Sequence, residues 1–127
     1  MRTRTKNWWL VVKGFIMNVQ VVWAKQPFPE TCSYSIFLAG PTPRSHVGRS
    51  WRTEALRVLR EFQYSGHVFV PEEEGGGFLE ITYDQQVLWE EEGLNRADVI
   101  VFWVPRKMDG MPGLTTNDEW GTWKHSR

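Results

Sequence analysis

Short apolar segments that end at glycine or proline limit most strictly how this chain can fold. Three of them span residues 34–39, 67–70 and 99–104, and they stop at Gly40, Pro71 and Pro105. Runs of this length without polar alternation are typical of strands covered on both faces, as in a parallel sheet. An earlier segment, Phe15–Trp23, alternates apolar and polar residues and predicts a strand with one buried face.

Helical patterns separate these strand segments. Ser50 is a suitable N-cap for a helix with apolar residues on one face and charged residues, Arg52 among them, on the other. Thr82 and Gln85 form a capping box for a second helix. Its expected apolar stripe consists of Val87, Leu88, Leu94 and Ala97. A third helix is predicted to begin near residues 115–119, so the order of elements predicts an α/β fold with a parallel sheet flanked by helices.

Ligands of parallel sheets bind beyond the carboxyl ends of the strands, which here are the loops 40–50, 71–82 and 105–118. The first loop ends at a helix N-terminus, and Arg44, Arg49 and Arg52 add donors that suit an anion. A phosphate-binding loop is one interpretation, and a solvated basic loop is the other. No Gly-Lys-Ser/Thr motif follows, which argues against a P-loop NTPase.

Three carboxylates lie near these loops. Asp98 suits a turn before a strand, Glu90 belongs to an acidic run typical of a solvated surface, and Glu119 lies near a helix N-terminus, which favours carboxylates. These structural roles stay open beside catalytic ones. A carboxylate can attack an anomeric carbon, arginine can hold phosphate, and aromatic rings can stack on bases. The combination indicates an enzyme that acts on a nucleoside or nucleotide.

Composition narrows the class of partner. The 15 Lys and Arg residues balance the 15 Asp and Glu residues, and zero net charge argues against binding to a nucleic acid polymer or an anionic membrane. The 8 Trp, 7 Phe and 3 Tyr residues predict an aromatic core or rings at a site. Cys32 is the single cysteine and the three histidines lack ligand spacing, so the sequence predicts no disulfide, no metal and no cofactor.

The N-terminal segment places Arg2, Arg4 and Lys6 before the apolar residues 8–12. That run is too short for a signal peptide or a membrane span, so we expect a cytoplasmic protein without a membrane anchor. Met17 stands at the start of a clean strand pattern. Residues 1–16 are therefore predicted to be an extension, and residues 17–127 the domain.

Five motifs follow one another in a recognisable order. They are Ile36–Arg44, Ser50–Arg52, Trp89–Glu90, Ala97–Arg106 and Met111–Gly121. Together they resemble the nucleoside 2-deoxyribosyltransferase-like family, in the superfamily of nucleoside deoxyribosyltransferases and deoxynucleoside 5′-monophosphate N-glycosidases. The resemblance implies a flavodoxin-like fold. It also implies cleavage of the N-glycosidic bond of a (deoxy)nucleoside or its 5′-monophosphate, with transfer of the sugar to another base or to water.

The resemblance assigns roles to individual residues. Glu119 matches the glutamate nucleophile that forms a glycosyl-enzyme ester, and Glu90 matches an acidic residue that protonates or orients the leaving base. The implied substrate-binding residues are Gly40, Pro41, Thr42, Arg44, Arg52, Asp98, Thr115, Thr116 and Asn117. The charges of Arg44 and Arg52 suit a 5′-monophosphate.

Family members usually continue after the glutamate-bearing helix with another strand and helix, whereas this sequence ends at Arg127. We therefore expect a flavodoxin-like sheet truncated at its C-terminus, in a homo-oligomer whose neighbouring copy completes the pocket. Two alternatives stay open: a non-catalytic nucleotide-binding module of the same fold, and an oligomeric interaction protein that uses exposed tryptophans.

Overall fold

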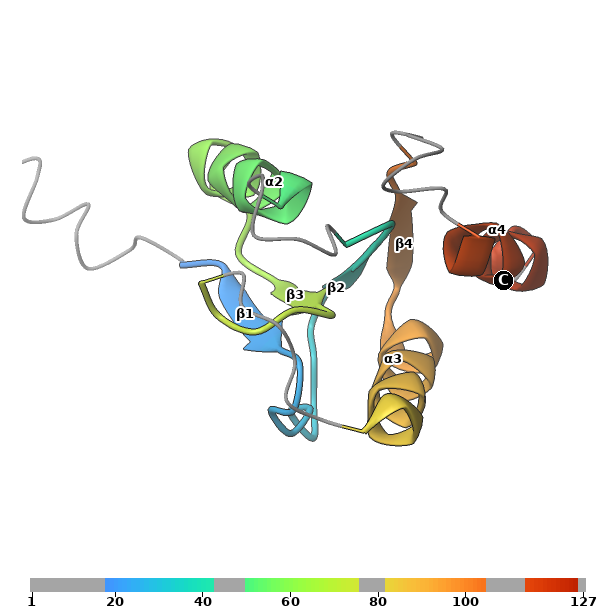
Figure 1. Cartoon of the computed structure of the whole chain (residues 1–127). Coiled ribbons are helices and arrows are strands. Elements are labelled where there is room, and N and C mark those ends of the chain that lie inside the picture. The colour runs from blue at the N-terminus through green and yellow to red at the C-terminus, as the bar shows by residue number, and fades with distance from the viewer. Residues whose placement is uncertain (1–17, 43–49, 76–81, 105–113, 126–127) are drawn as a thin grey trace, which may run out of the picture.

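A sheet of four parallel strands, with helices on both faces, forms the centre of the molecule (Figure 1). The computed structural model describes residues 18–42, 50–75, 82–104 and 114–125. The strands are β1 (Gln20–Trp23), β2 (Ser35–Ala39), β3 (His67–Val70) and β4 (Val99–Phe102). The helices are α2 (Trp51–Glu61), α3 (Tyr83–Arg96) and α4 (Leu114–Trp123). The predicted α/β, flavodoxin-like parallel sheet is confirmed.

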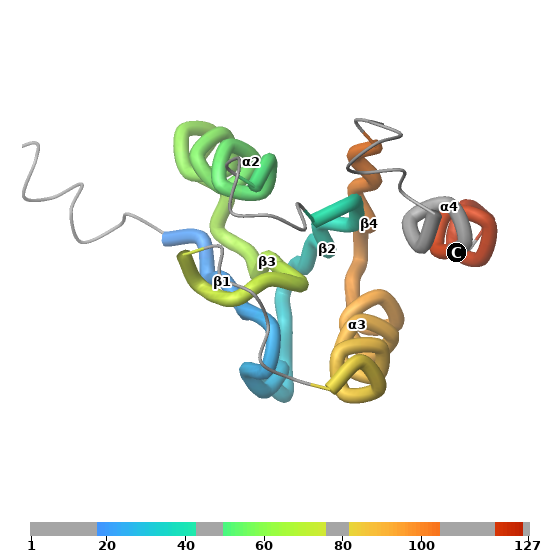
Figure 2. The backbone as a smooth tube through the Cα atoms, viewed as in Figure 1, coloured from blue at the N-terminus to red at the C-terminus, as the bar shows by residue number. Residues whose placement is uncertain are grey.

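The strand order is β1-β3-β2-β4, so the chain changes direction within the sheet. From β2 the chain passes through α2 to β3, which pairs with one edge of β2. From β3 it returns through α3 to β4, which pairs with the other edge of β2. Figure 2 traces this path, with β1 and β4 at the two ends of the sheet. The region beyond the carboxyl ends of β2 and β4 is therefore the topological switch point, where open α/β sheets bind ligands in a crevice.

Two apolar clusters fill the space between the sheet and its helices. On one face Leu56 of α2 packs with Leu38, Val68 and Val70. On the other face Leu94 of α3 packs with Phe37, Phe69 and neighbouring strand residues, joined by Trp123 of α4. Thus α2 covers one face, and α3 and α4 cover the other (Figure 1).

Two strands differ from the sequence prediction. Val22 of β1 belongs to the cluster on the α3 face while Val21 packs against the cluster on the α2 face, so both faces of β1 are covered rather than one. β4 was expected to be buried on both faces, but Val99 is 52% exposed and Val101 is 39% exposed. β4 is the edge strand, and an apolar run alone does not distinguish an edge strand from a central one.

The helices begin at their predicted caps, but the expected faces are partly wrong. The Ser50 hydroxyl accepts from the amide of Arg52, and the Thr82 hydroxyl accepts from the amide of Gln85. In α3 the expected stripe residues Val87 and Leu88 are exposed. In α2 the buried residues are Arg52 and Leu56, although Arg52 was expected on the charged face, and Phe62 after the helix is 82% exposed.

An aromatic cluster attaches α3 to the sheet. The Trp89 ring stacks on Phe28 at a centroid distance of 4.8 Å, and Phe28 meets Phe69 edge-on at 5.0 Å. The indole N–H of Trp89 donates to the carbonyl oxygen of Gln26 at 2.9 Å. These contacts hold the middle of α3 against the segment before β2 and against β3, and Glu90 is the next residue along the helix.

Gly93 allows α3 to approach the sheet this closely, and its substitution tests the packing. A Cβ at Gly93 would lie 2.7 Å from Cε2 of Phe37, so we expect Gly93→Ala to destabilise the fold by about 1–3 kcal/mol. Gly121 of α4 has no atom within 4 Å of a built Cβ. Gly121→Ala should therefore be neutral or stabilising by up to about 1 kcal/mol. Urea unfolding of both variants measures the difference, and equal stabilities would contradict this packing.

Candidate active site

The carboxyl ends of β2 and β4 meet closely at Gly40. Gly40 has a φ of 153°, and a Cβ there would lie only 2.3 Å from the carbonyl oxygen of Trp103. The rings of Trp51 and Trp103 lie 6.2 Å apart beside it, and Trp103 is 53% exposed. The indole N–H of Trp51 is buried without a hydrogen-bond partner among the described residues. Two tryptophans therefore border the switch point, one of them accessible to a ligand.

Arg52 lies directly beneath this end of β2, with only 1% of its surface exposed. Its Nε donates to the carbonyl oxygen of Leu38 at 2.9 Å, and its Nη2 donates to that of Gly40 at 2.6 Å. Its Nη1 donates to the Thr42 hydroxyl at 3.0 Å. The sequence predicts Arg52 as a substrate-binding residue; in the structure its guanidinium is buried and holds the first residues of the predicted substrate loop from below.

Glu72 supplies the counter-charge for Arg52. Its Oε1 lies 2.5 Å from Nη1 of Arg52 and accepts from the Ser50 hydroxyl at 2.6 Å, and the residue is 4% exposed. Burial lowers the pKa of Arg52 and the charge of Glu72 raises it. Arginine stays protonated in proteins, so the two residues form a buried ion pair.

Glu90 of α3 and Glu119 of α4 come together although they are far apart in the sequence. Their carboxyl groups share a hydrogen bond. Glu90 also accepts from Nε2 of Gln86, one helical turn earlier, at 2.8 Å. The two residues that the resemblance marks as catalytic are therefore direct neighbours on one face of the sheet.

Proximity changes how these carboxyls titrate. Burial, followed by the charge of Glu90 and the hydrogen bond with it, raises the pKa of Glu119 to about 7. Burial also raises the pKa of Glu90, while its hydrogen bonds and the charge of Arg52 oppose that change. Two carboxyls this close titrate as a unit, so we expect the pair to hold a shared proton below about pH 7, as one carboxylate and one carboxylic acid.

Asp98 is not brought to this pair. It lies immediately before β4, at the amino end of the strand, whereas Gly40 follows the carboxyl end of β2. Its Oδ2 accepts from the amide of Ser35 at 2.8 Å and from the Ser35 hydroxyl at 2.9 Å. These bonds join the starts of β2 and β4, and the sugar-binding role implied for Asp98 stays a prediction.

Four other predicted contacts cannot be located in the same way. Arg44 lies outside the described residues. Thr115, Thr116 and Asn117 belong to α4, but their side chains lie outside the described part of the structure.

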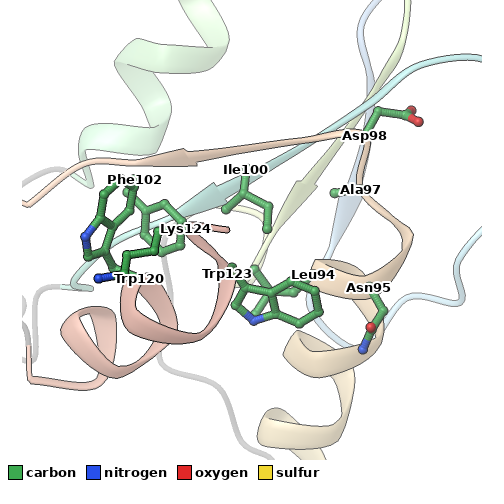
Figure 3. Close-up of a pocket in the computed structure, with 9 residues that line it drawn as sticks. All are labelled: Leu94, Asn95, Ala97, Asp98, Ile100, Phe102, Trp120, Trp123 and Lys124. Carbon is green, nitrogen blue, oxygen red and sulfur yellow. The ribbon is translucent and has the colours of Figure 1, made fainter. Parts of the chain in front are cut away.

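A pocket of about 440 Å³ opens between α3, β4 and α4 (Figure 3). In Figure 3 Trp120 and Lys124 lie at one end and Asp98 and Asn95 at the other, with Trp123 between them. Its walls come from Leu94, Asn95, Ala97, Asp98, Ile100, Phe102, Trp120, Trp123 and Lys124. Neither glutamate of the pair lines this pocket, whereas Asp98, a predicted substrate contact, does. Within the described ranges, no group of three or more His, Cys, Asp or Glu residues is placed to hold a metal.

A comparison with protein-family models agrees with this geometry. Residues 33–126 match the model described as nucleoside 2-deoxyribosyltransferase like. The chain belongs to the nucleoside 2-deoxyribosyltransferase-like family. The matched segment of this family member includes Arg52, Glu72, Glu90 and Glu119, while β1 precedes it. A search of curated proteins found no match.

The described part of this family member contains no helix that is both long and apolar enough to cross a membrane.

Glu72 is the site residue that sequence reasoning missed. It is the first of three consecutive glutamates, Glu72–Glu74, a pattern typical of a solvated loop, yet it is buried against Arg52. One signal was available: Glu72 follows β3 and Pro71, which places it at the carboxyl edge of the sheet. The adjacent Glu73 pairs with Lys25 at the surface, so neighbouring glutamates of this loop have different environments.

The shared proton predicts a pH-dependent contribution of Glu119 to stability. A carboxyl whose pKa is raised on folding stabilises the folded state while protonated, and that contribution is lost as pH rises through the folded value of about 7. We expect Glu119→Gln to be more stable than the wild type at about pH 8, by roughly 1–2 kcal/mol after allowance for partial exposure and screening. Near pH 5 the difference should be small.

Urea unfolding across this pH range measures the effect. Glu91→Gln provides the control, because it removes a carboxylate from an exposed position on α3. That variant should follow the wild-type curve within about 0.5 kcal/mol at every pH. Parallel curves for Glu119→Gln and the wild type would contradict a shared proton.

Proposed function

We propose that this protein cleaves the N-glycosidic bond of a (deoxy)nucleoside or its 5′-monophosphate through a glycosyl ester on Glu119. The observation that carries the proposal is the hydrogen-bonded pair of Glu90 and Glu119, which retains one proton near neutral pH. Retaining glycosidic cleavage needs one carboxylate as a nucleophile and one carboxylic acid to protonate the leaving group. The family match supports the same substrate class.

The reaction uses the pair in two steps. When the sugar separates the two carboxyls, the shared proton stays on Glu90 and Glu119 is left as a carboxylate. The Glu119 carboxylate attacks the anomeric carbon and the bond to the base breaks. The electron pair of that bond goes to the base nitrogen, which takes the proton of Glu90. Water or a second base then attacks the anomeric carbon and gives its proton to Glu90, and the ester bond breaks to restore the Glu119 carboxylate.

The switch point supplies surfaces for the rest of the substrate. Gly40, Pro41 and Thr42 border the crevice where the sugar of a bound nucleoside would enter. The partly exposed ring of Trp103 suits stacking on a nucleobase. Arg44, Asp98, Thr115, Thr116 and Asn117 remain predicted substrate contacts. A homo-oligomer in the cytoplasm likewise remains a prediction.

Separate substitutions of Glu119 and Glu90 distinguish the role of the nucleophile from that of the acid. We expect Glu119→Gln to abolish release of free base from every substrate. Glu90→Gln should reduce release from an ordinary deoxynucleoside by about 10²–10⁴-fold, because proton donation to the base is lost. The loss should be much smaller for a 7-methylguanine nucleoside, since its base leaves without taking a proton. Chromatography of released base measures both effects.

The same assay has a matched control and a direct test of the covalent step. Glu91→Gln should retain wild-type activity, because that exposed carboxylate lies away from the pair. A 2′-fluorinated nucleoside should leave a glycosyl adduct on the wild type that mass spectrometry locates on Glu119. Full base release by Glu119→Gln, or an adduct on another residue, would refute the proposal. Nucleotide binding without turnover by the wild type would favour the non-catalytic module.

The pH profile reports the proton of the pair. Activity needs the singly protonated pair, so kcat/KM should fall as pH rises above about 7, where the proton is lost. It should fall again in acid, when a second proton neutralises the nucleophile. Initial rates of base release from about pH 4 to 9 give the profile. A rate that stays constant through the neutral range would contradict the assignment of acid and nucleophile to these two glutamates.

A further inference from the structure

Glu72 joins three segments at the carboxyl edge of the sheet. Its side chain accepts from Ser50, the N-cap of α2, and from Arg52 in the first turn of that helix. Its carbonyl oxygen accepts from the amide of Ala24, which follows β1, at 3.0 Å. Glu72 itself follows β3. The ends of β1 and β3 and the start of α2 are therefore fastened at one residue, and Arg52 extends the connection to β2.

Most hydrogen bonds of the Arg52 side chain go to the segment that ends β2, residues 38–42. Leu38 and Gly40 offer carbonyl oxygens, and Thr42 offers its hydroxyl. The backbone at Gly40 has little freedom to move, because it already meets Trp103 closely. The planar guanidinium also fits only one arrangement of its three acceptors. The position of residues 40–42 thus depends on where Arg52 is held.

The charge of Arg52 also reaches the carboxyl pair. It favours the ionised forms of both Glu90 and Glu119, and so opposes the effect of burial on their pKa values. Within the described residues, the groups that act on the pair are its own two carboxyls from α3 and α4, Gln86 from α3, and Arg52 from α2. Arg52 therefore holds the backbone at residues 40–42 and also acts as a positive charge on the Glu90–Glu119 pair.

We propose that Arg52 and Glu72 act together as positioning residues of the candidate active site. Glu72 holds Arg52 in place, and the guanidinium fork fixes the backbone at residues 40–42 that receives the substrate. As a consequence of this placement, we expect the positive charge of Arg52 to favour the ionised member of the Glu90–Glu119 pair. Neither residue exchanges a proton or a bond with the substrate. This inference rests on the proposed function, because it concerns the same site.

Two sets of substitutions distinguish the effect of the hydrogen bonds of the Arg52 guanidinium from the effect of its positive charge. Arg52→Lys keeps a positive charge beside Glu72 but cannot reach Leu38, Gly40 and Thr42 together. It should raise KM for the nucleoside at least about tenfold, because the substrate surface is misplaced. The carboxyl titration should stay as in the wild type. The double variant Arg52→Met, Glu72→Gln removes both charges without leaving one unpaired, and its carboxyl pair should titrate at least about half a unit higher.

The titration is read without activity, from the carboxyl carbon resonances of Glu90 and Glu119 in ¹³C-labelled protein. Glu73→Gln is the matched control, because it removes the neighbouring carboxylate, which pairs with Lys25 at the surface. That variant should keep the wild-type titration and KM. A folded double variant with the wild-type titration would overturn the electrostatic part of the proposal. A wild-type KM in Arg52→Lys would overturn the part assigned to the fork.

A measurement on the wild type keeps the proposal testable if the double variant does not fold. The Nε resonance of Arg52 should shift with pH at the same midpoint as the Glu119 carboxyl, while that of Arg60, in the last turn of α2, should not. An Arg52 resonance that is unaffected through this titration would overturn the coupling. If the wild type releases no base from any nucleoside, the proposed function fails, and the resonances still decide whether Arg52 acts on the pair.

Discussion

The buried ion pair between Arg52 and Glu72 is the interaction on which the carboxyl edge of the sheet depends. A guanidinium that is 1% exposed needs an acceptor for nearly every N–H, and it finds them in Glu72, Thr42 and two carbonyl oxygens of the β2 end. Removing one partner of such a pair costs about 3–5 kcal/mol, because the other charge stays buried without compensation. The pair therefore acts as a constraint on the loops as much as a source of stability.

This constraint matters because of the strand order. In the order β1-β3-β2-β4, β2 is followed by α2 on one face of the sheet and β4 by α4 on the other, so the carboxyl ends of these neighbouring strands form the switch point. Gly40 brings the backbone of β2 against Trp103, and Arg52 holds the same turn from below. The backbone at Gly40 is thus held from both β4 and α2.

The sequence contains enough information to predict the elements, but not which faces they bury. Strands β2 and β3, the caps Ser50 and Thr82, and the start of α4 follow from local patterns that depend on a few adjacent residues. The environment of Arg52 does not, because helical periodicity assigns charged residues to the solvent side. Its burial depends on Glu72, twenty positions later and on another element. Likewise, the exposure of Val99 depends on where β4 falls in the sheet.

The Glu90–Glu119 pair shows why chemistry is harder to predict than fold. Neither glutamate has an unusual sequence context, and each on its own suits a solvated helix. They come together because α4 lies beside α3, where Trp123 joins the apolar cluster and Trp120 meets Phe102 edge-on at 5.3 Å. Burial between these elements raises the pKa of Glu119 first, and the charge of Glu90 and the hydrogen bond with it raise it further. The aromatic residues that pack α4 against the sheet therefore also help to bring the two carboxyls together, which no local pattern in the sequence indicates.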